Sequence, residues 1–170
     1  IDEKYDVIMV DAYQDITIPF QMSSVEFFTM VKEHLNENGV MVVNMNMRGN
    51  NEGNINQYLS DTIASVFDHI VTVDVDGSTN RELYASSNAD MVKTLENNAN
   101  ETGHSDLRDM MLHVADTSSV YEAGDYIMTD DKAPVELLGM QVIDQLIQGE
   151  VAYYKDIFEK DGINGLLESL

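Results

Sequence analysis

The chain has 170 residues, of which 44% are hydrophobic, and 31 acidic against 9 basic residues give a formal net charge of −22. This length suffices for one compact domain with a core, and the charge argues against nucleic acid as a partner because it repels phosphate. The absence of cysteine excludes disulfides, a thiol nucleophile and thiolate metal sites. The absence of cysteine is also compatible with a reducing cytoplasm, and we predict a cytoplasmic location.

The first predicted unit is a strand, a loop and a helix. Residues 5–12 place four apolar side chains between two acids, which is typical of a strand buried on both faces of a parallel sheet. Ser23 and Glu26 have the spacing of a capping box, and apolar residues follow at helical intervals until Gly39. We therefore predict a helix between this capping box and that glycine.

The same order then repeats along the chain. Residues 40–43 form a second predicted strand, and Asn54 is placed to cap a helix whose apolar stripe ends at Phe67. Residues 70–75 and 82–86 flank an Asp-Gly turn, which predicts an antiparallel hairpin. This alternation predicts an α/β sheet with right-handed crossovers.

The remainder of the chain is predicted to be mainly helical. Residues 88–118 indicate two short helices with a break near Gly103, and Pro134 is well placed to open another helix. Apolar residues within 157–166 indicate a final helical segment. Because no long linker divides the chain, we expect residues 1–170 to form a single domain. The opening apolar run without a methionine indicates part of a larger protein.

Four segments, in this order and spacing, resemble one known family. They are residues 5–13 (YDVIMVDAY), residues 18–28 around a helix entry, residues 38–44 (NGVMVVN) and residues 128–136 (MTDDKAPVE). The chain is similar to spermidine synthase-like proteins, which share the class I S-adenosylmethionine-dependent methyltransferase fold. The resemblance implies the C-terminal half of that Rossmann-like sheet, with parallel strands, a terminal antiparallel hairpin and helices on both faces.

The resemblance also implies where the cofactor binds. In the family, a glycine-rich loop and an acid hold S-adenosylmethionine or its decarboxylated form, and both would precede Ile1 here. The glycines within 49–53 lack that spacing. We therefore expect the cofactor-binding part to be absent and the isolated fragment to be inactive. Many bacterial relatives look fused to membrane-spanning segments, so a membrane tether of the parent protein stays open.

The activity that the resemblance implies is transfer of an aminopropyl group from decarboxylated S-adenosylmethionine to an amine such as putrescine. The amine must lose a proton before it attacks the carbon next to the sulfonium, and a neighbouring carboxylate can orient it and accept that proton. Two alternatives stay open. One is methyl transfer to a small molecule, and the other is a non-catalytic binding or interaction domain on the same fold.

Asp11 is the predicted catalytic residue. It matches the first acid of the family's loop and ends a predicted parallel strand, where open α/β sheets bind ligands; the alternative is a turn-forming aspartate. The family's second acid falls three residues later, where this sequence has Gln14, which cannot act as a base. Asp15 is placed to substitute through a shifted loop. Tyr13, Gln14 and Asp15 are therefore predicted to bind substrate.

A second acidic group is predicted near the end of the resemblance. Asp130, Asp131 and Glu136 are interpreted as substrate-binding residues for a small cationic amine. The alternative is ordinary helix-start chemistry, in which carboxylates favour the positive end of the helix dipole. No metal site is predicted, because the four histidines include no pair at the i, i+4 spacing.

The predicted first strand has a consequence for assembly. In the intact family sheet, another strand would cover one side of residues 5–11, and in this chain that edge is expected to be bare. Exposed apolar strand edges pair with other chains. We therefore predict self-association through residues 5–11, as a homodimer about a two-fold axis.

Overall fold

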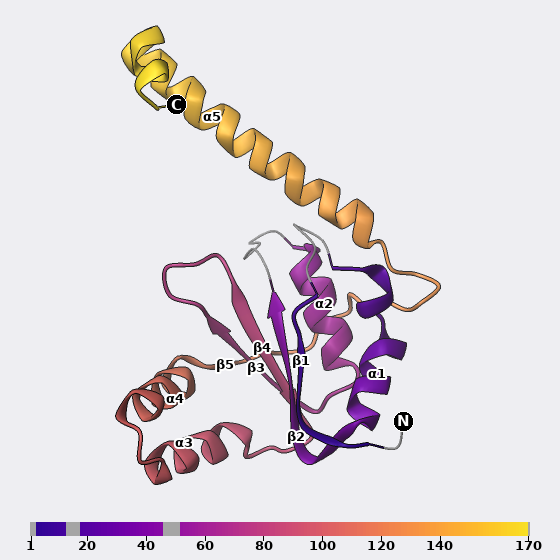
Figure 1. Ribbon diagram of the computed structural model, residues 1–170. Helices are drawn as coiled ribbons and strands as arrows, with labels where there is room; N and C mark the ends of the chain where they lie inside the picture. Colours follow the sequence, from indigo (N-terminus) through magenta and orange to yellow (C-terminus); the bar gives the residue numbers. More distant parts are fainter. Residues whose placement is uncertain (1–2, 13–17, 46–51, 170) are drawn as a thin grey trace.

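The computed structural model describes residues 3–12, 18–45 and 52–169, and its fold is α/β with one five-stranded mixed sheet (Figure 1). The strands are β1 (Tyr5–Val10), β2 (Leu35–Met45), β3 (His69–Asp74), β4 (Arg81–Ser86) and β5 (Ser119–Val120). They lie in the order β1-β2-β4-β3-β5, with β1 parallel to β2 and the other neighbours antiparallel. The predicted α/β class, the first parallel pair and the β3–β4 hairpin are confirmed.

Helices lie on both faces of this sheet, as predicted (Figure 1). They are η1 (Phe20–Met22), α1 (Val25–Glu33), α2 (Ile55–Ala64), α3 (Met91–Glu101), α4 (Ser105–Thr117) and α5 (Val135–Ser169). α1 and α2 cover one face, and α3 and α4 lie on the other. α5 begins beside α2 and then extends away from the body. No helix in the described ranges is both long and apolar enough to cross a membrane.

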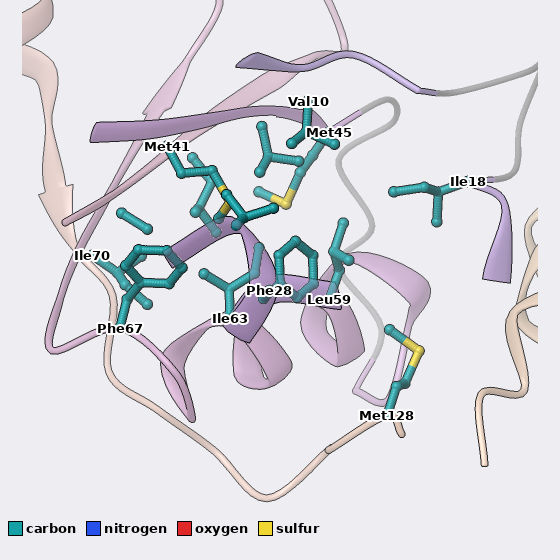
Figure 2. Packing of buried hydrophobic residues seen from close by; sticks show 14 of the residues in the cluster. Val10, Ile18, Phe28, Met41, Met45, Leu59, Ile63, Phe67, Ile70 and Met128 are labelled. Atoms are coloured by element: carbon teal, nitrogen blue, oxygen red, sulfur yellow. The ribbon is translucent and has the colours of Figure 1, made fainter. Parts of the chain in front are cut away.

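The core lies between the sheet and the helices α1 and α2. In β2 the side chains of Met41, Val43 and Met45 are buried and alternate with half-buried ones, because successive side chains of a strand point to opposite faces. Figure 2 shows this face of the sheet meeting Phe28 of α1 and the apolar stripe of α2. Burial of each large apolar side chain contributes about 1.5 to 3 kcal/mol, so this cluster positions both helices.

The start of α1 corrects the predicted capping box. Ser24, not Ser23, is the N-cap residue, and its Oγ accepts a hydrogen bond from the Phe27 N–H at 3.2 Å. Ser23 instead donates its hydroxyl to the carbonyl of Phe20 at 2.8 Å and so closes η1. The short helix before α1 therefore moves the cap by one residue.

Two other boundaries differ from the predictions. β2 begins at Leu35 rather than at residue 40, because α1 ends at Glu33 and the chain enters the sheet at once. The two-residue strand β5 was not predicted, since so short a strand has no periodicity to detect. The C-terminal helical region, α5, consists of two helices that meet at Gly162, whose φ of 65° is not helical.

A buried carboxylate ties the segment 121–128 to α2. Asp61 is 1% exposed and accepts hydrogen bonds from the Tyr121 hydroxyl at 2.6 Å, the Gly124 N–H at 3.0 Å and the Tyr126 N–H at 3.1 Å. Burial and then the bond to Asp61 raise the pKa of the Tyr121 phenol, so the hydroxyl stays a donor. We define this group of contacts as the Asp61 anchor.

Substitution of Gly124 by alanine tests the Asp61 anchor. A Cβ at Gly124 would stand 2.5 Å from Oδ2 of Asp61, so the carboxylate or the segment must move and lose hydrogen bonds. We expect G124A to lower the free energy of unfolding by about 2 kcal/mol, measured by urea denaturation with circular dichroism. The control is G103A, because a Cβ there meets nothing within 4 Å. An equal loss in both variants would contradict the anchor.

Candidate functional site

Asp11 lies directly after β1, at the carboxyl end of the parallel pair. Val10 pairs with Val43 of β2, so the next position brings Asp11 beside Asn44, whose Nδ2 donates to Oδ1 of Asp11 at 3.1 Å. Asp11 is exposed on the face of β1 opposite to the buried Val10. The predicted position of Asp11 at the carboxyl end of a strand is therefore confirmed, while its catalytic role stays a prediction.

Polar side chains continue from Asp11 across the sheet. Asn44 is paired in register with Glu82 of β4, and its Oδ1 accepts a hydrogen bond from Nδ2 of Asn80 at 3.2 Å. Directly opposed residues on neighbouring strands share a face, so these side chains lie on the same side of the sheet. We call Asp11, Asn44, Asn80 and Glu82 the polar row.

The electrostatics of the polar row favour a cation. Burial raises the pKa of the Glu82 carboxyl, and the negative charge of Asp11 raises it further. Burial and the charge of Glu82 also raise the pKa of the Tyr84 phenol on the same strand. A positive group between Asp11 and Glu82 would relieve the repulsion between their carboxylates. An ammonium group has both the charge and the hydrogen-bond donors for this position.

The same face of the sheet is apolar next to the polar row. It forms the floor of a cavity of about 350 Å³ that α3 and α4 roof. The sheet residues that line this cavity are mostly apolar: Val7, Asn38, Val40, Val42, Val71 and Tyr84. A carboxylate pair beside an apolar surface suits a ligand that combines an ammonium group with an alkyl chain.

The other predicted site residues lie elsewhere or outside the described ranges. Tyr13, Gln14 and Asp15 fall outside the described residues. Asp130 lies at the start of α1, where the Ser24 hydroxyl donates to its carboxylate and its own N–H donates to Oε2 of Glu26 at 3.0 Å. These contacts hold Asp130 at the start of α1, which is not the helix that Pro134 opens.

Asp131 and Glu136 are exposed, one in the turn before α5 and one in the first turn of that helix. No hydrogen bond among the described residues joins either of them, or Asp130, to Asp11, so their role in substrate binding stays a prediction. In the part of the chain that the structure describes, no group of three or more His, Asp or Glu side chains is placed to hold a metal.

Sequence reasoning missed three members of the polar row. Asn44 directly follows the predicted strand 40–43, and Glu82 begins the predicted strand 82–86. The alternation along each strand places Asn44 and Glu82 on the face opposite to the core, and this placement can be predicted from the sequence. The order of the strands is also needed to bring them beside Asp11, and the spacing along the chain does not give that order.

Comparison with known proteins adds one curated relative, while no protein-family model matches the chain. The chain is 52% identical over 185 aligned residues to the "Probable polyamine aminopropyl transferase" of Bifidobacterium longum. It is a homologue of that protein. The predicted resemblance to spermidine synthase-like proteins is thereby confirmed. The alignment covers 99% of this chain and 42% of the relative, so the chain spans less than half of the relative's length.

Two solved structures are also similar. Human methyltransferase-like protein 13 in complex with SAH has a TM-score of 0.45 and 16% identity, over 71% of this chain and 52% of that one. A probable spermidine synthase from Corynebacterium glutamicum has a TM-score of 0.37 and 18% identity, over 73% of this chain and 49% of that one.

The raised pKa of Glu82 predicts a pH-dependent stability. In the folded protein the pKa of Glu82 lies above its ordinary value of 4.5. Between these two pKa values the folded protein therefore binds more protons than the unfolded chain, and its free energy of unfolding falls as the pH rises. In E82Q the fall in Tm from pH 4.5 toward neutrality should be smaller than in the wild type. E96Q, at an exposed acid of α3, is the control. An equally reduced fall in E96Q would show that general charge is responsible.

Proposed function

We propose that this chain forms the amine-binding side of an aminopropyl transferase site and that Asp11 is its catalytic residue. The observation that carries the proposal is the polar row, in which the carboxylates of Asp11 and Glu82 flank Asn44 at the carboxyl end of the parallel pair. Identity of 52% to a probable polyamine aminopropyl transferase supports this reaction. The acceptor is a small cationic amine such as putrescine.

Asp11 orients the amine and takes its proton. Asn44 engages Oδ1 of Asp11, so we assign Oδ2 to the amine. A protonated amine is attracted by Asp11 and Glu82, and transfer of one N–H proton to Asp11 exposes the nitrogen lone pair. That lone pair would then be free to attack a bound donor. Decarboxylated S-adenosylmethionine, when bound, supplies the electrophilic carbon next to its sulfonium.

The described residues do not by themselves fit this cofactor. A nucleoside cofactor needs backbone amides at close approach and an acid for its ribose hydroxyls. Gly53 is the described glycine just before α2, and its N–H already donates to Oε1 of Gln57 at 2.7 Å. Gly77 lies in the β3–β4 turn and Gly162 within α5. We therefore assign only the acceptor side of the site to these residues.

The strand order supports a finer interpretation of the fold. A parallel pair is followed by a hairpin whose second strand, β4, lies between β2 and β3. A sheet that ends in such a hairpin is what the family resemblance implies for the C-terminal half of a class I methyltransferase-like domain. We infer that the chain corresponds to this half.

Amine binding by the 170-residue chain tests the proposal. We expect putrescine to shift the side-chain amide signals of Asn44 and Asn80 in a saturable way in ¹⁵N NMR spectra, because both amides belong to the polar row. D11N should weaken this binding about tenfold, since a charge-assisted hydrogen bond is lost. Calorimetric titration with decarboxylated S-adenosylmethionine should show no comparable binding by this chain.

Two controls separate a specific site from general charge. D76N removes the same charge from an exposed acid of the β3–β4 turn, whose side chain is 85% exposed, and should leave putrescine binding unchanged. 1,4-Butanediol has the length of putrescine without its charges and should not shift the signals. Equal weakening in D76N and D11N would contradict the site. Absence of any putrescine effect would favour the non-catalytic alternative.

A further inference from the structure

Asn80 is connected to Asp11 through a second asparagine. It is half-buried and lies at the end of the turn that joins β3 to β4. Its Nδ2 donates to Oδ1 of Asn44 at 3.2 Å, and Nδ2 of Asn44 donates in turn to Oδ1 of Asp11 at 3.1 Å. Among the described contacts, Asn80 therefore reaches the proposed catalytic carboxylate by way of Asn44.

The direction of these two hydrogen bonds follows from the chemistry of the groups. An ionised carboxylate only accepts hydrogen bonds, so Asn44 must turn its amide nitrogen toward Asp11. The carbonyl oxygen of Asn44 then faces Asn80, which supplies a donor through its own amide nitrogen. If the Asn44 amide turned by half a rotation, two oxygens would meet at Asp11 and two nitrogens at Asn80. The donor on Asn80 therefore favours one orientation of Asn44.

The β3–β4 turn fixes the position of Asn80. Its carbonyl accepts a hydrogen bond from the N–H of Val75 at 3.0 Å, and its own N–H donates to Oγ of Ser78 at 3.1 Å. One residue further, Nε of Arg81 donates to Oδ1 of Asp74 at 2.7 Å, and these two residues are paired across the hairpin. Contacts before and after Asn80 therefore hold its backbone, with its side chain directed toward β2.

We propose that Asn80 is a positioning residue of the amine site, which acts on Asp11 by fixing the orientation of the Asn44 amide. This inference rests on the proposed function, in which Oδ2 of Asp11 takes the proton of the amine. With the Asn44 amide held, Oδ1 of Asp11 stays bound and Oδ2 is left for the amine. Without the donor on Asn80, the reversed Asn44 amide becomes accessible, and its oxygen would repel the Asp11 carboxylate.

A double-mutant cycle in putrescine binding, measured by calorimetric titration, tests this role. We expect N80A to weaken binding about fivefold, which corresponds to the loss of one neutral hydrogen bond. N44A should weaken binding at least as much. Because Asn80 acts through Asn44, adding N80A to N44A should cause no further loss. A residue that merely supported the fold would weaken binding by the same factor in both backgrounds.

The matched control is an asparagine at the other end of the same two strands. Nδ2 of Asn36 donates to Oδ1 of Asp6 at 2.6 Å, so an asparagine of β2 again contacts an aspartate of β1. N36A deletes this bond outside the polar row and should leave putrescine binding unchanged. Equal weakening by N36A and N80A would overturn the proposal.

A measurement without amine tests the orientation itself. In NMR spectra of the wild-type chain, nuclear Overhauser contacts should join the side-chain amide protons of Asn44 to the β protons of Asp11. These contacts should weaken in N80A and persist in N36A. Unchanged contacts in N80A, or the same loss of affinity from N80A with and without N44A, would overturn the proposal.

The two readouts separate this inference from the proposed function. If the wild-type chain binds no putrescine, the proposed function fails, and the amide contacts still decide whether Asn80 orients Asn44. If putrescine binds to the wild type and to N80A with equal affinity, the role of Asn80 fails and the proposed function stands.

Discussion

The structure depends on the buried carboxylate of Asp61. A buried charge is costly unless hydrogen bonds satisfy it, and here three donors from residues 121–126 do so. The same segment continues to Met128, whose N–H donates to Thr62 and whose carbonyl accepts from the N–H of Val25. The segment 121–128 is therefore hydrogen-bonded to both α2 and α1, and it leads into the start of α5. Both helices that cover the core face of the sheet are held in this way.

With one face of the sheet occupied by α1 and α2, alternation along the strands builds the candidate site on the other face. In β2 the buried Val43 and Met45 bracket Asn44, which points away from the core. In β4 the buried Leu83 follows Glu82 in the same manner. The residues that fill the core and those that form the polar row are thus consecutive, and neither set can shift along its strand without moving the other.

Much of this architecture could be predicted from local patterns. The apolar run before Asp11 and the Asp-Gly turn of the hairpin gave the parallel pair and the β3–β4 pair, because each depends on neighbouring residues alone. The polar row could not be predicted as a unit, since Asn44 and Glu82 meet only through the strand order. Ser24 replaced Ser23 as the cap of α1 because η1, which has too few residues to show periodicity, uses the Ser23 hydroxyl.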